Sequence, residues 1–217
     1  MTLQVDCYWS FRSPYSYLAV PRMLDWQQKY DLKFNVRVVY PLAVRVDGFF
    51  ERQHPQWLPY LARDCAREAQ RMWLPFARPD PDPIVMDYST GQVSTEQPYI
   101  QRLTRLGAAA AEAQKGLEFI NHVSRLIWSG EVNGWHLGTH LDEAAKRAGI
   151  NLVELETKIT ETPDLYEQAI QNNQKAHAEA GHWGVPLFVF KSEPFFGQDR
   201  MDTLMWRLQQ NGLSARL

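Results

Sequence analysis

Residues 3–16 read Leu-Gln-Val-Asp-Cys-Tyr-Trp-Ser-Phe-Arg-Ser-Pro-Tyr-Ser, and the fold can be worked out from this stretch. Its first half, residues 3–9, is rich in strand-forming residues and alternates loosely, which predicts a β-strand. Ser13-Pro14 is typical of a helix start, with serine as the N-cap and proline at the first helical position. We expect this helix to reach about residue 30, with a kink at Pro21 because proline removes a backbone hydrogen bond.

A second strand is predicted over residues 33–40, where apolar side chains alternate along one face. Those side chains are Phe34, Val36, Val38 and Tyr40. A strand, a helix and a strand at this spacing form a βαβ unit, which favours a parallel pair with a right-handed crossover.

The middle of the chain, residues 46–182, is predicted to be helical without a convincing strand. We expect helices over 59–73, 107–128 with a break near Gly116, 139–148, from Asn151, and over 163–180. Ser94 and Gln97 have the spacing of a capping box that opens another helix. Residues 75–83 contain four prolines and should form an extended linker.

Strands return at the C-terminal end, over 186–191 and 193–196, before an amphipathic helix over 198–210. The two ends must meet in one sheet, because a two-stranded fragment is not stable alone. The sequence therefore predicts an α/β fold in which residues 1–45 and 183–217 form one unit. Residues 46–182 form an all-helical insertion into it.

Composition excludes several classes of protein. The 217 residues carry a formal charge of −2 and are 45% hydrophobic, as in an ordinary globular chain. Without a basic excess, nucleic acid and anionic membranes are poor partners. No apolar run is long enough to cross a membrane and no secretory signal is visible, so we expect a cytoplasmic protein.

The cysteines and histidines predict neither a disulfide framework nor a metal site. Cys7 and Cys65 are far apart in the sequence and are expected to be buried thiols. His136 and His140 are four residues apart, but no carboxylate follows at ligand spacing. We expect no metal.

Three short motifs should converge on one site. Ser13-Pro14-Tyr15-Ser16 lies at the junction of a strand and a helix, and Gly184-Val185-Pro186 comes directly before a strand. The third motif, residues 195–200, reads Phe-Phe-Gly-Gln-Asp-Arg and opens the last helix.

The element order and these motifs resemble the thioredoxin fold as it is elaborated in the disulfide-oxidoreductase A family. In that family the first helix begins with Cys-Pro-X-Cys and faces a cis-proline, which Pro186 would supply here. Residues 13–18, 60–64 and 196–201 are more specifically similar to kappa-class glutathione transferases and 2-hydroxychromene-2-carboxylate isomerases. The likeness in element order covers most of the chain.

Serine in place of cysteine changes the chemistry of the first motif. A hydroxyl group cannot form a disulfide, so thiol–disulfide exchange through this motif is excluded. What remains is a helix N-terminus with free N–H groups, which can stabilise the thiolate of a bound molecule. If that thiol is glutathione, Ser13 would lower its pKa and be the catalytic residue. Alternatively, Ser13 only caps the helix.

The resemblance implies glutathione as the cofactor and gives roles to further residues. Val185, before a cis-Pro186, would pair in strand fashion with the cysteinyl part of glutathione. Gly197, Gln198 and Asp199 would hold the γ-glutamyl end. Without the resemblance there is a simpler alternative for both residues. Pro186 would be an ordinary trans proline at the start of a strand, and Asp199 would be a charge that stabilises a helix N-terminus.

By the same resemblance Asp64 would help to hold the γ-glutamyl end of glutathione, across the subunit interface if the chain forms a homodimer as its relatives do. The alternative is that Asp64 is a solvated charge on a helix.

Phe11, Tyr15 and Trp183, together with Trp9, could form an apolar wall for a small aromatic substrate. The alternative is that these four rings only pack the interface between the two domains.

The function implied is that of a glutathione-dependent cis–trans isomerase of the 2-hydroxychromene-2-carboxylate type, in the catabolism of aromatic compounds. The alternatives are a kappa-like glutathione transferase and a non-catalytic thioredoxin-fold binding protein. One departure favours the last: the family's Asn-Lys-Pro-Pro stretch is replaced here by residues 47–52, Asp-Gly-Phe-Phe-Glu-Arg. Arg45, Arg52 and Gln53 are the candidates to take over its asparagine and lysine.

Overall fold

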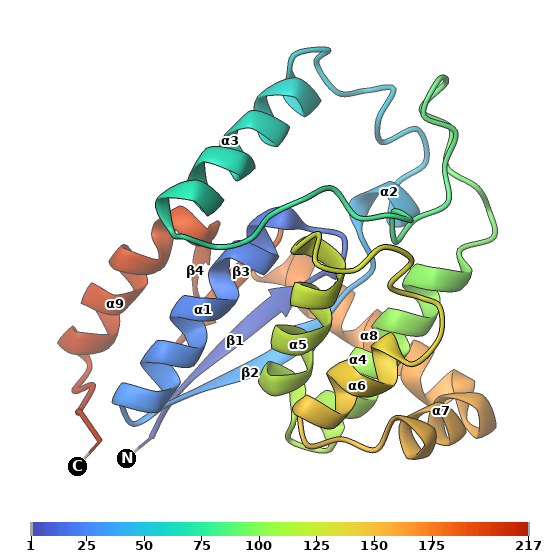
Figure 1. Ribbon diagram of the computed structural model, residues 1–217. Coiled ribbons are helices and arrows are strands. Elements are labelled where there is room, and N and C mark those ends of the chain that lie inside the picture. Colours follow the sequence, from blue (N-terminus) through green and yellow to red (C-terminus); the bar gives the residue numbers. More distant parts are fainter. Residues whose placement is uncertain (1, 217) are drawn as a thin grey trace.

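The computed structural model describes residues 2–216, and Figure 1 shows its helices and strands. The elements in chain order are β1 (Leu3–Trp9), α1 (Pro14–Lys29), β2 (Leu32–Val38), α2 (Leu42–Arg45), α3 (Trp57–Arg71), α4 (Pro98–Glu112), α5 (Gly116–Trp128), α6 (His140–Arg147), α7 (Leu152–Glu161), α8 (Pro163–Glu179), β3 (Leu187–Phe190), β4 (Glu193–Phe196), the 3-10 turn η1 (Gln198–Arg200) and α9 (Met201–Gln210). The outermost residues of the predicted unit, 1 and 217, lie outside the described residues.

The two ends of the chain form one sheet of four strands in the order β2-β1-β3-β4. β1 and β2 are parallel, as the βαβ unit predicts, and Leu3 is paired with Leu32. β3 runs antiparallel to β1, and β4 antiparallel to β3. The predicted α/β thioredoxin-like fold is confirmed.

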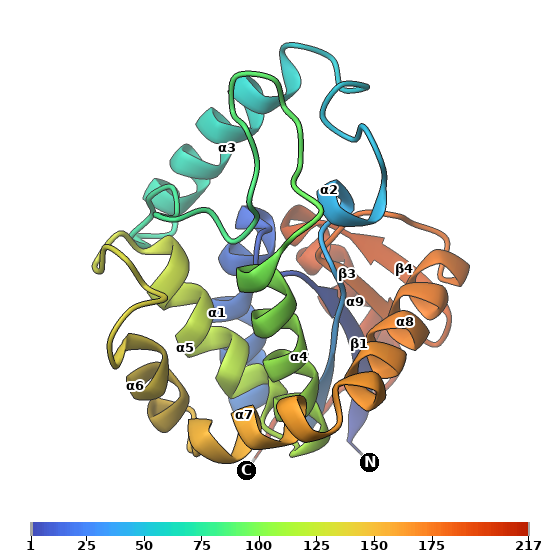
Figure 2. The same cartoon turned by 90° about the vertical axis from the view of Figure 1, so that its right-hand side faces the viewer.

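Both faces of the sheet are covered by helices (Figure 2). Successive side chains of a strand point to opposite faces. Accordingly, Cys7 and Trp9 of β1 belong to the large core shared with α1 and α9, whereas Tyr8 lies in a smaller cluster with Ala176 of α8 and its C-cap residue Ala180. This places the C-terminal end of β1 between the two layers, where the loop that carries Ser13 begins.

The helical middle differs from the prediction in two details. Gly107 lies inside α4 rather than at a helix start, whereas the predicted break near Gly116 is confirmed, because α5 begins at that residue. The predicted capping box does not form, because Gln97 is itself the N-cap of α4 and its amide side chain bonds Val85 N–H and C=O, each at 2.8 Å. The proline-rich residues 75–83 contain no helix or strand, as expected.

One apolar core joins the sheet to most of the helices. In contrast, α3 projects beside the sheet with only Cys65 and Ala69 buried (Figure 1). The division into residues 1–45 plus 183–217 and residues 46–182 stays a prediction. Within residues 2–216 no helix has the length and apolar character needed to cross a membrane.

Candidate active site

Ser13 caps α1 at the C-terminal end of β1. Its backbone is extended (φ −92°, ψ 115°), and its Oγ accepts a hydrogen bond from Ser16 N–H at 3.2 Å. The Ser13 hydroxyl donates to the carbonyl oxygen of Val185 at 3.3 Å. Two motifs that are 172 residues apart in the sequence therefore meet at one hydroxyl group.

The first turn of α1 leaves one backbone donor free. Pro14 has no N–H, the Ser16 N–H bonds Ser13 Oγ, and the Tyr17 N–H bonds the Ser13 carbonyl at 3.2 Å. Among residues 2–216 the Tyr15 N–H has no acceptor. A helix N-terminus with a free N–H favours a negative charge at this place.

The peptide bond between Val185 and Pro186 is cis, which confirms the conformation implied by the resemblance. The Pro186 carbonyl accepts a hydrogen bond from Gly197 N–H at 2.9 Å, so the second and third motifs also meet. Gly197 has φ +93°, and a Cβ there would overlap the Asp199 carboxylate. Only glycine fits this position without strain.

An open groove of about 650 Å³ lies beside these residues. Its lining includes Tyr15, Asp64, Val185, Phe196, Gly197, Gln198 and Asp199. Most of the residues predicted for the cofactor thus lie around one hollow, between the N-terminus of α1, α3 and η1.

Tyr15 lines the groove, but its hydroxyl group is already engaged. It donates to Asp64 Oδ2 at 2.6 Å, and Arg67 bonds the other carboxylate oxygen at 2.6 Å. The Tyr15 hydrogen bond is the main reason that the pKa of Asp64 lies below its ordinary value. Asp64 is therefore ionised at neutral pH. Burial, followed by the same hydrogen bond, raises the pKa of Tyr15.

Sequence reasoning missed the other charged residues of the groove. Glu68 lies one turn beyond Asp64 on α3; it accepts from Gln198 Nε2 at 3.2 Å and pairs with Arg71 at 2.8 Å. The Arg71 hydrogen bond lowers the pKa of Glu68. The spacing i, i+4, i+7 from Asp64 to Arg71 could have indicated this face. Arg22 and Asp202, which pair with each other, also line the groove.

The prediction that Phe11 and Trp9 line a substrate pocket is wrong, since both side chains are fully buried. Their rings pack edge to face at 4.6 Å, and a Cβ at Gly107 would lie 2.9 Å from the Phe11 ring. Phe11 thus fills the space that a glycine leaves on α4. The Phe11 carbonyl accepts from Trp128 Nε1 at 2.9 Å, which fixes the loop before Ser13.

Trp183 is exposed over 62% of its surface and lies at the rim rather than in the lining of the groove. Its ring packs with those of His182 and Phe196, with the His182 and Phe196 centroids 3.7 Å apart. Phe196 itself lines the groove. These three rings form an aromatic cluster beside Val185.

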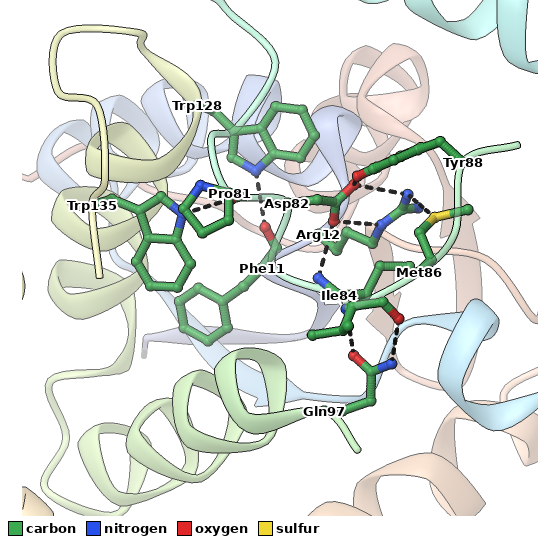
Figure 3. A network of polar contacts seen from close by, with 11 residues as sticks. Phe11, Arg12, Pro81, Asp82, Ile84, Met86, Tyr88, Gln97, Trp128 and Trp135 are labelled. Atoms are coloured by element: carbon green, nitrogen blue, oxygen red, sulfur yellow. Dashed lines mark hydrogen bonds and ion pairs between the residues drawn. The ribbon is translucent and has the colours of Figure 1, made fainter. Parts of the chain in front are cut away.

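Arg12, next to Ser13, is tied to the proline-rich segment (Figure 3). Its guanidinium makes two hydrogen bonds to Asp82, at 3.0 and 3.1 Å. Asp82 also accepts from Ile84 N–H and the Tyr88 hydroxyl, each at 3.0 Å. The proline-rich segment therefore holds the loop before Ser13 from outside the groove.

The three candidates for the family's missing asparagine and lysine do not line the groove. Arg52 bonds the carbonyl groups of its own loop, and Gln53 donates to the Phe49 carbonyl at 3.0 Å. The Arg45 Nε is buried and has no partner among residues 2–216. Its burial lowers the Arg45 pKa.

Neither cysteine can take part in exchange chemistry at the groove. Cys7 and Cys65 are free and fully buried, as predicted. Burial raises the pKa of both thiols, to about 12 for Cys65. Within the described residues, no His, Cys, Asp and Glu side chains gather as a metal site would require.

The chain belongs to the family of DsbA-like thioredoxin domains, whose model matches residues 4–209. No curated protein is significantly similar in sequence.

Solved structures share the fold. A 2-hydroxychromene-2-carboxylate isomerase is 23% identical, with a TM-score of 0.66 over 96% of this chain and 95% of that chain. The cytosolic disulfide reductase DsbM from Pseudomonas aeruginosa, in a structure with GSH, is 16% identical, with a TM-score of 0.57 over 95% of this chain and 100% of that chain. A probable DsbA oxidoreductase from Streptomyces coelicolor is 15% identical, with a TM-score of 0.66 over 96% of this chain and 89% of that chain. At sequence identities this low, the similarity to these structures establishes a common fold and nothing about activity.

Proposed function

We propose that this protein is a glutathione-dependent cis–trans isomerase of the 2-hydroxychromene-2-carboxylate type that acts on a small aromatic conjugated substrate. The observation that carries the proposal is the Ser13 hydroxyl at the N-terminus of α1, 3.3 Å from the Val185 carbonyl oxygen. Ser13 is not itself part of the groove lining, but Val185 and Tyr15 are. Because serine has no sulfur, thiol chemistry at this position needs a sulfur from outside the chain. The free backbone N–H donors beside Ser13 suit a thiolate.

Two donors would stabilise that sulfur. The Ser13 hydroxyl can turn from the Val185 carbonyl to the thiolate, and the unpaired Tyr15 N–H adds a second hydrogen bond. Hydrogen bonds to the charged form and the helix N-terminus both lower the pKa of a thiol. Ser13 would be the catalytic residue, because its hydroxyl would contact the reacting sulfur.

Backbone and charged groups would hold the rest of glutathione. Among residues 2–216 the Val185 N–H has no acceptor, so it is available for strand-like pairing with the cysteinyl unit. Gln198 and Asp199 would receive the γ-glutamyl end beside Gly197. Asp64 is ionised and would attract its ammonium group, from the same chain or across a homodimer interface.

When bound, glutathione supplies a thiolate that adds reversibly to a conjugated carbon–carbon double bond, which then rotates as a single bond. The chain's part is to keep the sulfur ionised through Ser13 and to offer an apolar place for the substrate. Phe196 at the groove and Trp183 at its rim would provide that place. Because reduced thiols persist in the cytoplasm, we expect the protein to work there, in aromatic-compound catabolism.

Product analysis with a thiol assay tests the reaction type. The purified protein is incubated with glutathione and a cis-configured aromatic enone, and free thiol and both isomers are followed. Isomerisation without net loss of thiol is the expected result. Stoichiometric loss of thiol with formation of a stable adduct would instead identify a glutathione transferase.

A non-catalytic binding protein is the second candidate, favoured by one observation. Arg45, Arg52 and Gln53 do not line the groove, so the family's asparagine and lysine have no replacement there. Calorimetry with glutathione separates the candidates at the first step. Absence of binding would contradict both the isomerase and the transferase.

A further inference from the structure

Two histidines hold Gly184, the residue before Val185, from opposite ends. His177 Nε2 lies 2.9 Å from the Gly184 carbonyl oxygen, and His182 Nδ1 accepts the Gly184 N–H at 2.9 Å. His177 is buried on α8 and stacks on Tyr8 of β1 with 5.0 Å between ring centroids. Both backbone groups of one glycine thus depend on imidazole side chains.

The tautomers follow from these partners. A carbonyl oxygen can only accept, so the His177 proton is on Nε2. A backbone N–H can only donate, so His182 Nδ1 is bare and its proton is on Nε2. Both rings must keep the Nε2–H form for the two hydrogen bonds to exist together.

Fixing the Gly184 carbonyl also fixes the next N–H group. The bond between Gly184 and Val185 is a trans peptide, so this carbonyl and the Val185 N–H point in opposite directions. Because His177 holds the carbonyl toward α8, the Val185 N–H is directed away from α8. Val185 lines the groove, and the other lining residues come from α1, α3, α9 and the segment from β4 to η1, with none from α8.

Gly184 itself is confined by packing. A Cβ at this position would overlap the Phe196 ring and lie 3.2 Å from His182 Cε1. The Phe196 and His182 rings in turn stack on each other. The segment before Pro186 is therefore held by two hydrogen bonds and by an aromatic surface.

We propose that His177 and His182 are positioning residues that orient the Val185 N–H toward the groove and so set the affinity for the thiol-bearing tripeptide. The proposal rests on the proposed function, because glutathione is the ligand that Val185 would receive. Neither histidine touches the sulfur, so their effect is expected in binding rather than in ionisation of the thiol.

Substitutions of His182 separate the hydrogen bond from the ring. His182→Phe keeps an aromatic ring against Phe196 and removes the acceptor, whereas His182→Asn keeps an acceptor oxygen near the position of Nδ1. His122→Phe on α5 is the matched control, since His122 is also half-buried and lies outside the groove lining. Glutathione affinity is measured by calorimetry, and exchange of the Gly184 amide and both imidazole tautomers are measured by NMR.

His182→Phe should weaken glutathione binding about tenfold and speed exchange of the Gly184 amide, while His182→Asn stays within about twofold of the wild type in both. Unchanged binding in His182→Phe, or an Nδ1–H tautomer of either ring, would overturn the proposal. If the wild type binds no glutathione, the proposed function fails, while the tautomers and the Gly184 exchange still decide whether the two histidines hold the segment.

Discussion

The Tyr15 hydroxyl lies 2.6 Å from Asp64 Oδ2 and links the first turn of α1 to the projecting helix α3. This hydrogen bond joins the turn that begins at Ser13 to the helix whose face carries Glu68 and Arg71. It ties α3 to α1 and lowers the pKa of Asp64.

Tyr15→Phe should therefore loosen α3 and raise the pKa of Asp64. We expect a loss of about 1–2 kcal/mol in the free energy of unfolding and weaker glutathione binding. Denaturant titration and calorimetry measure the two effects. Tyr40→Phe is the control, because the Tyr40 hydroxyl also donates to a carboxylate, Glu167 Oε1, at 2.6 Å and Tyr40 lies outside the groove lining. An equal loss of glutathione binding in the two variants would contradict this role.

Gly197→Ala tests the turn that joins Pro186 to η1. An added Cβ would face both a positive φ and the Asp199 carboxylate, so we expect a cost of about 1–3 kcal/mol and displacement of Asp199. Gly212→Ala separates the two causes: its φ is +81° but nothing lies within 4 Å. Glutathione affinity should fall only in Gly197→Ala, and an equal fall in both variants would show that Asp199 is not involved.

Asp82→Asn tests whether the proline-rich segment supports the loop before Ser13 (Figure 3). The Arg12–Asp82 pair is poorly exposed, at 20% and 10%, so leaving Arg12 without its counter-charge should cost about 2–3 kcal/mol. Thermal and denaturant unfolding measure the cost. Glu156→Gln breaks the more exposed pair with Arg102 and should cost less than about 1 kcal/mol. Similar values for the two variants would refute the role of Asp82.

Stability should fall as the pH drops below neutral because of His177. Burial lowers its pKa from 6.5 to about 4, so between these values the unfolded chain binds a proton that the folded chain does not. The contribution is complete above 6.5 and should shrink by about 3 kcal/mol on reaching pH 4. His177→Gln removes the titration and should flatten the stability curve in this window. Parallel curves for the two proteins would contradict the assignment.

Much of the sheet could be predicted from the sequence, because β1 is rich in strand-forming residues and Gly197 marks the end of β4. β1 was expected at residues 3–9 and β4 at 193–196, and both are confirmed. The short helix α2 was missed, since Leu42–Arg45 is too short to show a period.

The site was predicted less completely. Ser13, Val185 and Gly197 meet as expected because each belongs to a motif at the end of an element. Phe11 was misplaced because closeness to Ser13 along the chain says nothing about the side on which a loop residue packs. The partners of Gly184 could not be predicted, since His177 reaches it only through the packing of α8 on the sheet.

The role of Ser13 is tested by titrating the glutathione thiol through its ultraviolet thiolate absorbance, in the presence of wild type, Ser13→Ala and Ser16→Ala. Ser16 is the matched control, because its hydroxyl is buried and makes no hydrogen bond within residues 2–216. We expect a lowered thiol pKa with wild type and with Ser16→Ala. With Ser13→Ala, the pKa should rise by about one unit or more at nearly unchanged affinity. The same thiol pKa with all three proteins would contradict the proposal that Ser13 lowers the pKa of the bound glutathione thiol.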